Sequence, residues 1–243
     1  MNLEPMNLMK RMAALLLLVT PALPTYATAM YDVSIYGDLT IDTVVGSAPL
    51  LTQTNKGSLI NTDNAPPIYS QAAAESSATP FTTNTLRILS SVSGFADTDG
   101  ANSSAQAERS AGYTVTNNGN DSVTLLATVD VSWAWTLLVD DVANEFASNI
   151  IGLEIYIDDP LNPFAVLVNQ FNQTPPTNSD SANFTWQLDV SDSLAILEPG
   201  QTREIWVRTS AAGVARTIPE PGTLWVMMIG LAGLGGIRRR VAI

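Results

Sequence analysis

The 243-residue sequence contains no cysteine and no histidine. Without cysteine the chain has no disulfide, and it has no thiolate ligands for a structural zinc site. Without histidine it has no Ser-His or Cys-His nucleophile and no imidazole to act as the usual general base at neutral pH. Any catalysis would therefore depend on carboxylates, and the core must be stable without cross-links. We predict that the protein is not an enzyme and has no cofactor.

Basic side chains are also scarce, with 11 Lys and Arg against 23 Asp and Glu, a formal net charge of −12. Leaving out residues 1–29 and 219–243 removes five bases and two acids, so the central region has 21 acids, six bases and a net charge of −15. A surface that negative repels phosphate backbones. We therefore expect no nucleic-acid partner.

The amino-terminal segment has the pattern of a secretory signal peptide. Lys10 and Arg11 form a positive region, and residues 12–19 form a short apolar region. Ala27 and Ala29 fit the small-residue pattern of a cleavage site. A buried helix or an uncleaved anchor is the alternative, but the apolar run is too short to span a bilayer. We predict that residues 1–29 are a signal peptide removed after Ala29.

The carboxyl-terminal segment combines three features in a fixed order. These are Pro219, Glu220 and Pro221, then an uncharged apolar run over residues 223–237, and finally Arg238, Arg239 and Arg240. The prolines exclude helix and central strand, and the apolar run would make a helix about 22 Å long. Because arginine clusters stay on the cytoplasmic side, the main domain would lie outside. We predict a short transmembrane helix in a tail that spans residues 217–243.

This order resembles the PEP-CTERM sorting signal of Gram-negative bacteria that produce exopolysaccharide. The resemblance covers residues 218–243 only. It implies that an exosortase, a membrane-embedded transpeptidase-like enzyme, cleaves at or near Pro219, Glu220 and Pro221. The protein would then pass through the inner membrane transiently and reach the cell surface or the extracellular matrix. An ordinary single-pass anchor with an accidental Pro-Glu-Pro is the alternative.

Between the two ends, apolar and polar residues alternate with a period of two, which is typical of half-buried strands. Long alternations cover residues 31–41, 123–135 and 151–157, and shorter strands are expected at residues 86–92, 113–116, 163–168, 184–190 and 203–209. Residues 117–121 and 198–201 carry turn signals that favour hairpins. We predict that residues 30–216 form an all-β, antiparallel β-sandwich, which also resembles immunoglobulin-like surface domains.

Two stretches of this region are harder to assign. Residues 46–84 are rich in Ser, Thr, Asn, Ala and Pro, so we predict a long polar loop or a hairpin excursion at the surface there. Residues 102–111 could form a strand or a short helix. A strand is favoured because Ala105, Ala107 and Ala111 are in phase with Tyr113 and Val115.

One acidic turn is a candidate metal site. Asp97 and Asp99 precede Gly100, as in the start of a calcium loop. The register of an EF-hand then fails, because Phe95 and Gln106 would occupy its first and twelfth positions. We expect a solvated acidic turn, with a Ca²⁺ site at Asp97 and Asp99 as the alternative.

Other acids and the tryptophans are weaker candidates. Asp140 and Asp141 form one acidic pair and Asp158 and Asp159 another, and paired carboxylates are what a glycosidase needs. Neighbouring acids in a strand point to opposite faces, however, and loop acids are usually solvated. Trp133 and Trp135 share one face of a strand, where they could stack on sugars but more often form the core. Trp186 and Trp206 present the same choice, and Trp206 is expected to be exposed because it is out of phase with its neighbours.

Two classes of function remain open. We favour a non-catalytic surface or biofilm-matrix protein that is exported, sorted by its tail and active in adhesion or in assembly with exopolysaccharide. The alternative is a secreted carbohydrate-active enzyme that uses carboxylates alone. Both would be exported and both would bind polysaccharide, so release of reducing ends is the observation that separates them.

Overall fold

The structure is a computed structural model that describes residues 28–65, 69–97, 100–140, 143–173, 179–187 and 195–218. These residues form strands and no α-helix. The strands are β1 (Ala29–Val45), β2 (Leu50–Ala65), β3 (Ser70–Pro80), β4 (Thr85–Ala96), β5 (Asn102–Thr116), β6 (Val123–Val139), β7 (Glu145–Ile157), β8 (Ala165–Gln173), β9 (Ser179–Gln187), β10 (Ile196–Leu197) and β11 (Thr202–Thr217). The prediction of an all-β domain is confirmed.

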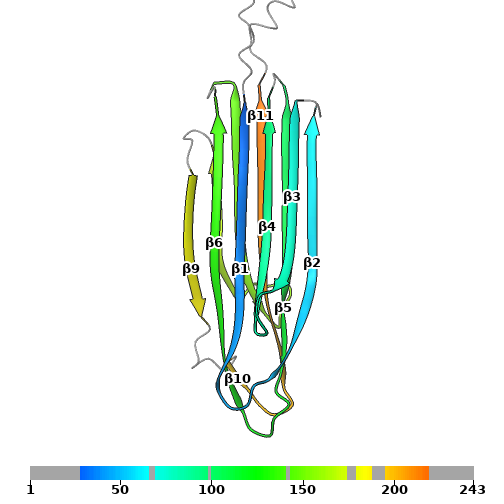
Figure 1. Cartoon of the computed structure of the whole chain (residues 1–243), viewed down its shortest axis with the longest axis vertical. Coiled ribbons are helices and arrows are strands. Elements are labelled where there is room, and N and C mark those ends of the chain that lie inside the picture. The colour runs from blue at the N-terminus through cyan, green and yellow to red at the C-terminus, as the bar shows by residue number, and fades with distance from the viewer. Residues whose placement is uncertain are drawn as a thin grey trace, which may run out of the picture.

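The strands make two antiparallel sheets that run along the long axis of the molecule (Figure 1). Sheet A has the order β10-β6-β1-β4-β3, and β9 pairs with β6 on the same edge as β10. Sheet B has the order β2-β5-β11-β7-β8. The central strands of sheet A face the central strands of sheet B, with β1 and β4 in contact with β11. The arrangement is therefore β-sandwich-like.

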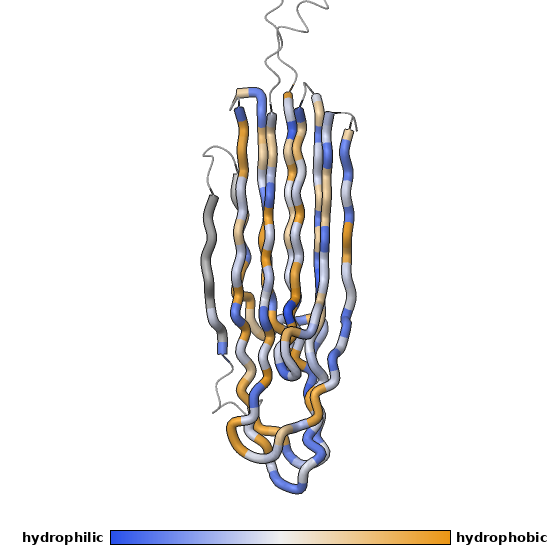
Figure 2. The backbone as a smooth tube through the Cα atoms, viewed as in Figure 1, coloured by the Kyte–Doolittle hydropathy of each residue, from blue (hydrophilic) through white to orange (hydrophobic). Residues whose placement is uncertain are grey.

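The core lies between the sheets and follows the alternation of the sequence. In β1 the buried residues include Tyr31, Val33, Ile35, Leu39 and Ile41, which are the apolar positions of the pattern. The same change of hydropathy from one residue to the next is visible along several strands in Figure 2. Since successive side chains of a strand point to opposite faces, this pattern buries one face of each sheet and leaves the other to solvent.

Two glycines make room for the largest buried side chain of β1. A Cβ added to Gly213 in β11 would lie 2.1 Å from Cδ2 of Tyr31, and one added to Gly94 in β4 would lie 2.4 Å from the Tyr31 hydroxyl oxygen. The Tyr31 side chain therefore occupies space that any side chain at position 94 or 213 would fill. Its hydroxyl is 3.3 Å from Oγ of Ser103 in β5, so Tyr31 also links the two sheets.

The polar stretch at residues 46–84 is neither a long loop nor a hairpin of two paired strands, so this prediction is wrong. It contains β2 and β3, which are the edge strands of sheet B and sheet A. Thirteen of the 16 residues of β2 are exposed, so its side chains carry no period-two signal. The strand forms because its backbone pairs with β5, a property that side-chain patterning does not reveal.

The two predicted hairpins are also wrong, although turns are present. Residues 117–122 connect β5 of sheet B to β6 of sheet A, and residues 198–201 connect β10 of sheet A to β11 of sheet B. Gly200 has a φ of 78°, which suits glycine at that turn. Residues 102–111 form most of β5, as predicted, and Ala105, Ala107 and Ala111 are buried.

Candidate functional site

The outer face of sheet A carries a row of polar side chains that crosses four strands. Thr185 of β9 lies opposite Asp130 of β6, which lies opposite Asp38 of β1, which in turn lies opposite Arg87 of β4. The hydroxyl of Thr185 donates a hydrogen bond of 2.5 Å to Asp130. Strands in register thus bring together residues that are up to 147 positions apart in the sequence.

Arg87 is held in place by charge and by two rings. Its Nε and Nη2 donate to the two carboxylate oxygens of Asp38 at 2.8 and 2.6 Å. Its guanidinium carbon lies 4.9 Å from the ring centre of Tyr36 and 4.8 Å from that of Phe81. The hydrogen bond to Asp38 raises the pKa of Arg87 above its ordinary value. The guanidinium of Arg87 is therefore held by Asp38 and lies over one face of the Tyr36 ring.

A shallow hollow of about 260 Å³ lies over this row. It is lined by Tyr36, Asp38, Arg87, Asp130, Val131, Ser132 and Thr185. The lining offers an aromatic ring, carboxylate acceptors, a guanidinium donor and hydroxyl groups. This combination suits a ligand that has both an apolar face and several hydroxyl groups. We call it the sheet A hollow.

Other hollows of the described domain lack part of this chemistry. One of about 500 Å³ lies near the start of β2, and one of about 230 Å³ lies over β3 and β4. Neither has an aromatic ring or a basic side chain in its lining. The sheet A hollow is the candidate with the most specific set of groups.

Sequence reasoning did not find the sheet A hollow. Its residues lie at the polar positions of the alternation in β1 and β6, which a pattern assigns to solvent. One signal was available, because Tyr36 is an aromatic residue at a polar position of residues 31–41. No pattern could have placed Arg87 or Thr185 beside it, since strand order is a property of the tertiary structure.

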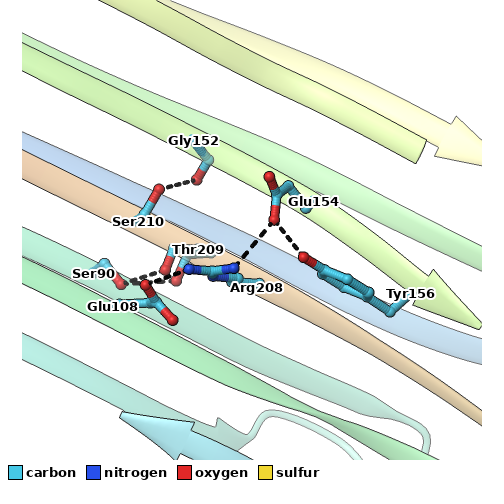
Figure 3. A network of polar contacts seen from close by, with 8 residues as sticks. All are labelled: Ser90, Glu108, Gly152, Glu154, Tyr156, Arg208, Thr209 and Ser210. Carbon is cyan, nitrogen blue, oxygen red and sulfur yellow. Dashed lines mark hydrogen bonds and ion pairs between the residues drawn. The ribbon is translucent and has the colours of Figure 1, made fainter. Parts of the chain in front are cut away.

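The outer face of sheet B carries a network centred on Arg208 (Figure 3). Nη2 of Arg208 lies 2.7 Å from Glu108 of β5, and Nη1 lies 3.7 Å from Glu154 of β7. The hydroxyl of Tyr156 donates to Glu154 at 2.6 Å. The hydrogen bond to Glu108 raises the pKa of Arg208. Each carboxylate of this network is engaged with Arg208, so the network fastens β5, β11 and β7 together.

Three of the tryptophans, Trp133, Trp135 and Trp206, belong to the packed structure. Trp135 is 8% exposed and lies in the core. Trp133 is on the same face of β6, is partly buried and packs against the core. Trp206 was expected to be exposed, and this is wrong, since its exposed fraction is 4%. It lies on the outer face of sheet B, where the ring of Tyr156 stacks on it at 5.3 Å and Nζ of Lys56 lies 4.8 Å from its centre. The Trp186 side chain lies outside the described part.

The acids at the end of β7 have structural partners. Asp158 pairs with Arg203 and accepts a hydrogen bond from the backbone nitrogen of Glu204. Asp159 accepts hydrogen bonds of 2.8 Å from the Asn162 side chain and from the backbone nitrogen of Leu161, and these bonds lower its pKa. This pair therefore holds the link between β7 and β8. Asp140 directly follows β6, and Asp141 lies outside the described residues.

The candidate calcium turn is described only in part. Asp97 follows β4 and accepts a hydrogen bond of 3.0 Å from the hydroxyl of Thr28, whereas Asp99 lies outside the described residues. Within the described ranges no three acidic side chains lie close enough together to hold a metal ion. The Ca²⁺ site at Asp97 and Asp99 stays a prediction.

Comparison with known proteins concerns the tail. The family model described as the PEP-CTERM protein-sorting motif matches residues 217–240. The tail is a PEP-CTERM sorting motif. This motif implies export and processing by an exosortase. No curated protein and no solved structure matches the chain, so the immunoglobulin-like resemblance stays a prediction.

The PEP-CTERM motif begins where the described domain ends. Thr217 is the last residue of β11, while the predicted motif residues Pro219, Glu220, Pro221, Arg238, Arg239 and Arg240 lie outside the described residues. The same holds for the predicted helix at 223–237 and for Ala27 of the signal peptide. Ala29 is the buried first residue of β1, opposite Val139. Among the residues that the structure describes, no helix is long and apolar enough to cross a membrane.

Proposed function

We propose that this protein is a non-catalytic surface or matrix protein, sorted by its PEP-CTERM tail, that binds a neutral polysaccharide in the sheet A hollow. The observation that carries the proposal is the Tyr36 ring beside the ion pair of Arg87 and Asp38, on an open polar sheet face. Sugar rings have an apolar face that stacks on aromatic rings, and their hydroxyl groups both donate and accept hydrogen bonds.

The charge of the domain supports a neutral ligand. Arg87 in the lining of the hollow is already paired with Asp38, and Asp130 is exposed. The hollow therefore offers no free cation to bind an anionic sugar. The central region as a whole has a net charge of −15. A polymer of acidic sugars would therefore be repelled at low ionic strength, when the Debye length is long.

The test is retention of the exported protein on immobilised polysaccharides, with reducing ends measured in the same samples. We expect stoichiometric retention on a neutral polymer, none on a polyuronate and no product. Tyr36→Ala combined with Asp130→Asn should abolish retention. The matched control is Tyr69→Ala, because Tyr69 is 42% exposed and lies outside the hollow.

Each outcome has a defined meaning. Release of reducing ends would favour the alternative, a carbohydrate-active enzyme that uses carboxylates. Retention that survives the double substitution in the hollow would show that the sheet A hollow is not the site. No retention on any polymer would reject polysaccharide binding altogether, while leaving the sorting function of the tail unaffected.

A further inference from the structure

The last strand of the domain ends directly before the sorting motif. β11 is the central strand of sheet B and pairs with β5 on one side and with β7 on the other, as far as Arg216 and Thr217. Because its backbone groups are used on both sides, no further extended chain can pair with it. Pro219 has no backbone N–H, so this pairing cannot continue into the motif.

The end of β11 is fastened by backbone and hydroxyl contacts. The backbone nitrogen of Thr217 donates to the carbonyl of Ala101 at 3.0 Å, and its carbonyl accepts from Gly100 at 3.2 Å. The hydroxyl oxygen of Thr217 accepts from the backbone nitrogen of Ala101 at 3.0 Å. The nitrogen of Ile218 donates to the carbonyl of Asn144 at 2.6 Å. Thr217 is 5% exposed, so its bonds are sheltered from water. We call this set of contacts the β11 clamp.

Very little chain separates the β11 clamp from the apolar run of the tail. Residues 219–222 alone lie between Ile218 and the start of that run at Thr223. Even fully extended, the five steps from Ile218 to Thr223 span at most about 18 Å. An enzyme that holds the chain in an extended form on both sides of the scissile bond would also need the residues before the motif. Those residues are held in the β11 clamp.

We propose that the β11 clamp controls the processing of this chain by exosortase. It confines cleavage to peptide bonds on the carboxyl side of Ile218, and it opens locally before the enzyme can hold the residues that precede the motif. The acyl carbon of the broken bond passes to water or to an acceptor amine, and the released tail carries the new amino group. The inference rests on the sorting part of the proposed function and is independent of polysaccharide binding.

The position of the β11 clamp allows it to open without unfolding the domain. Its partners are Gly100 and Ala101 just before β5, and Asn144 just before β7, so the contacts lie at the ends of the strands. Ile218 is 54% exposed, and opening can begin there from the solvent side. Strand ends open locally at a lower free energy than the core. When opening and closing are fast, the rate of cleavage follows the population of the open form.

The first test weakens the β11 clamp in the full-length precursor. Thr217→Val keeps the shape of the side chain but removes the hydroxyl that accepts from Ala101. We expect the rate of processing, measured by pulse labelling in cells that carry the exosortase, to rise about fivefold, because the loss of one hydrogen bond shifts a local opening equilibrium by about that factor. The matched control is Thr202→Val at the opposite end of β11, whose hydroxyl is 3.1 Å from that of Thr116. We expect this control to be processed at the normal rate.

A second control separates local opening from a general loss of stability. Ser90→Ala removes a buried contact with Thr209, which lies eight residues before Thr217 in β11. We expect this variant to be processed at the normal rate even though its melting temperature falls. Equal acceleration in Ser90→Ala would overturn the proposal, because it would show that global unfolding and not the β11 clamp limits processing.

A spacer tests the same idea from the other direction. Inserting Gly-Ser-Gly-Ser between Ile218 and Pro219 gives the enzyme flexible residues to hold while the β11 clamp stays closed. We expect the spacer to accelerate processing at least as much as Thr217→Val, and we expect Thr217→Val to add nothing further in the chain that carries the spacer. The mass of the mature natural chain should show that Ile218 is retained.

Three results would each overturn the proposal while leaving sorting intact. These are a mature chain that ends before Ile218, an unchanged rate in Thr217→Val, and an unchanged rate in the chain with the spacer. A natural chain that is never shortened would reject the sorting function and this inference together. Loss of polysaccharide retention would leave both standing.

Discussion

At the scale of single residues, Tyr31 shows how a side chain links the two sheets and makes folding depend on pH. Its ring fills the space over Gly213 and its hydroxyl meets Ser103. Burial raises the pKa of Tyr31 above its ordinary value of about 10, and the hydrogen bond with Ser103 opposes this in part. The folded state therefore holds the phenol proton more tightly than the unfolded state does.

The raised pKa of Tyr31 should make the folded state less stable at alkaline pH. The pKa of Tyr31 is higher in the folded state than in the unfolded state. The contribution of Tyr31 to the free energy of unfolding is therefore fully present below the unfolded pKa of about 10 and is lost as the pH rises through the folded pKa. We predict that the urea midpoint of the protein falls steeply above pH 10 and that Tyr31→Phe makes this fall shallower. Ser103→Ala removes the hydrogen bond between Tyr31 and residue 103 but keeps the phenol. The urea midpoint of this variant should therefore still fall above pH 10. An equally steep fall in Tyr31→Phe would assign the effect to other groups.

At the scale of elements, the sheets are joined by few polar contacts across an apolar core. Ser90 of β4 and Thr209 of β11 are both fully buried, and their hydroxyl oxygens lie 2.8 Å apart. Ser90 also donates to the backbone carbonyl of Thr209 at 3.1 Å. These groups sit between two central strands, where nothing but the opposite sheet can satisfy them. The pair therefore helps to set the position of β4 over β11.

Removing one partner of this pair should cost more than removing both. We predict that Ser90→Ala lowers the free energy of unfolding by about 1–3 kcal/mol, because the Thr209 hydroxyl is left buried without this partner. Adding Thr209→Val should recover part of that loss, since apolar groups of the same shape need no partner. Urea denaturation of the two single variants and the double variant measures the coupling.

The control for this cycle is the exposed hydroxyl pair of Thr116 and Thr202, whose oxygens are 3.1 Å apart. Thr116→Ala should change stability by no more than about 0.5 kcal/mol, because water replaces the lost partner. If the changes in the free energy of unfolding caused by Ser90→Ala and Thr209→Val simply added in the double variant, the polar link between the sheets would have no energetic role.

At the scale of the whole molecule, both ends of the described domain lie at one pole (Figure 1). Thr28 bonds to Asp97 after β4, and the carbonyl of Thr217 accepts from Gly100 in the same link. Ile218, the last described residue, thus lies at the same pole as Thr28, the first described residue.

Sorting gives a prediction at this same scale. Changing both Pro219 and Pro221 to alanine lets helix extend back through the predicted cleavage region, because alanine restores the backbone donors and removes the ring clash. We expect this variant to accumulate in the membrane with its tail intact, as seen in the mass of the protein by mass spectrometry. The matched control, Pro80→Ala and Pro199→Ala in the domain, should be processed normally. Normal processing of the tail variant would contradict the role of the two prolines.

The sequence by itself determined the β class, the main core strands and the sorting tail. Alternation in residues 31–41 and 123–135 is a local signal, since a strand buried on one face must be apolar at every second position. The motif at residues 217–240 is likewise read directly from the order of residue types. The absence of cysteine and histidine excluded whole classes of chemistry without any structure.

Only the tertiary structure decided which strands are neighbours, and with them the sheet A hollow and the exposed edge of β2. Tyr36, Arg87 and Thr185 meet because β4, β1, β6 and β9 pair in that order, and nothing local in the chain states that order. The β2 strand escaped the pattern because its side chains are exposed on both faces and its stability comes from the backbone of β5. Trp206 was misplaced for a related reason: at a position on the outer face of sheet B, Tyr156 of the neighbouring β7 and Lys56 of the more distant β2 bury it.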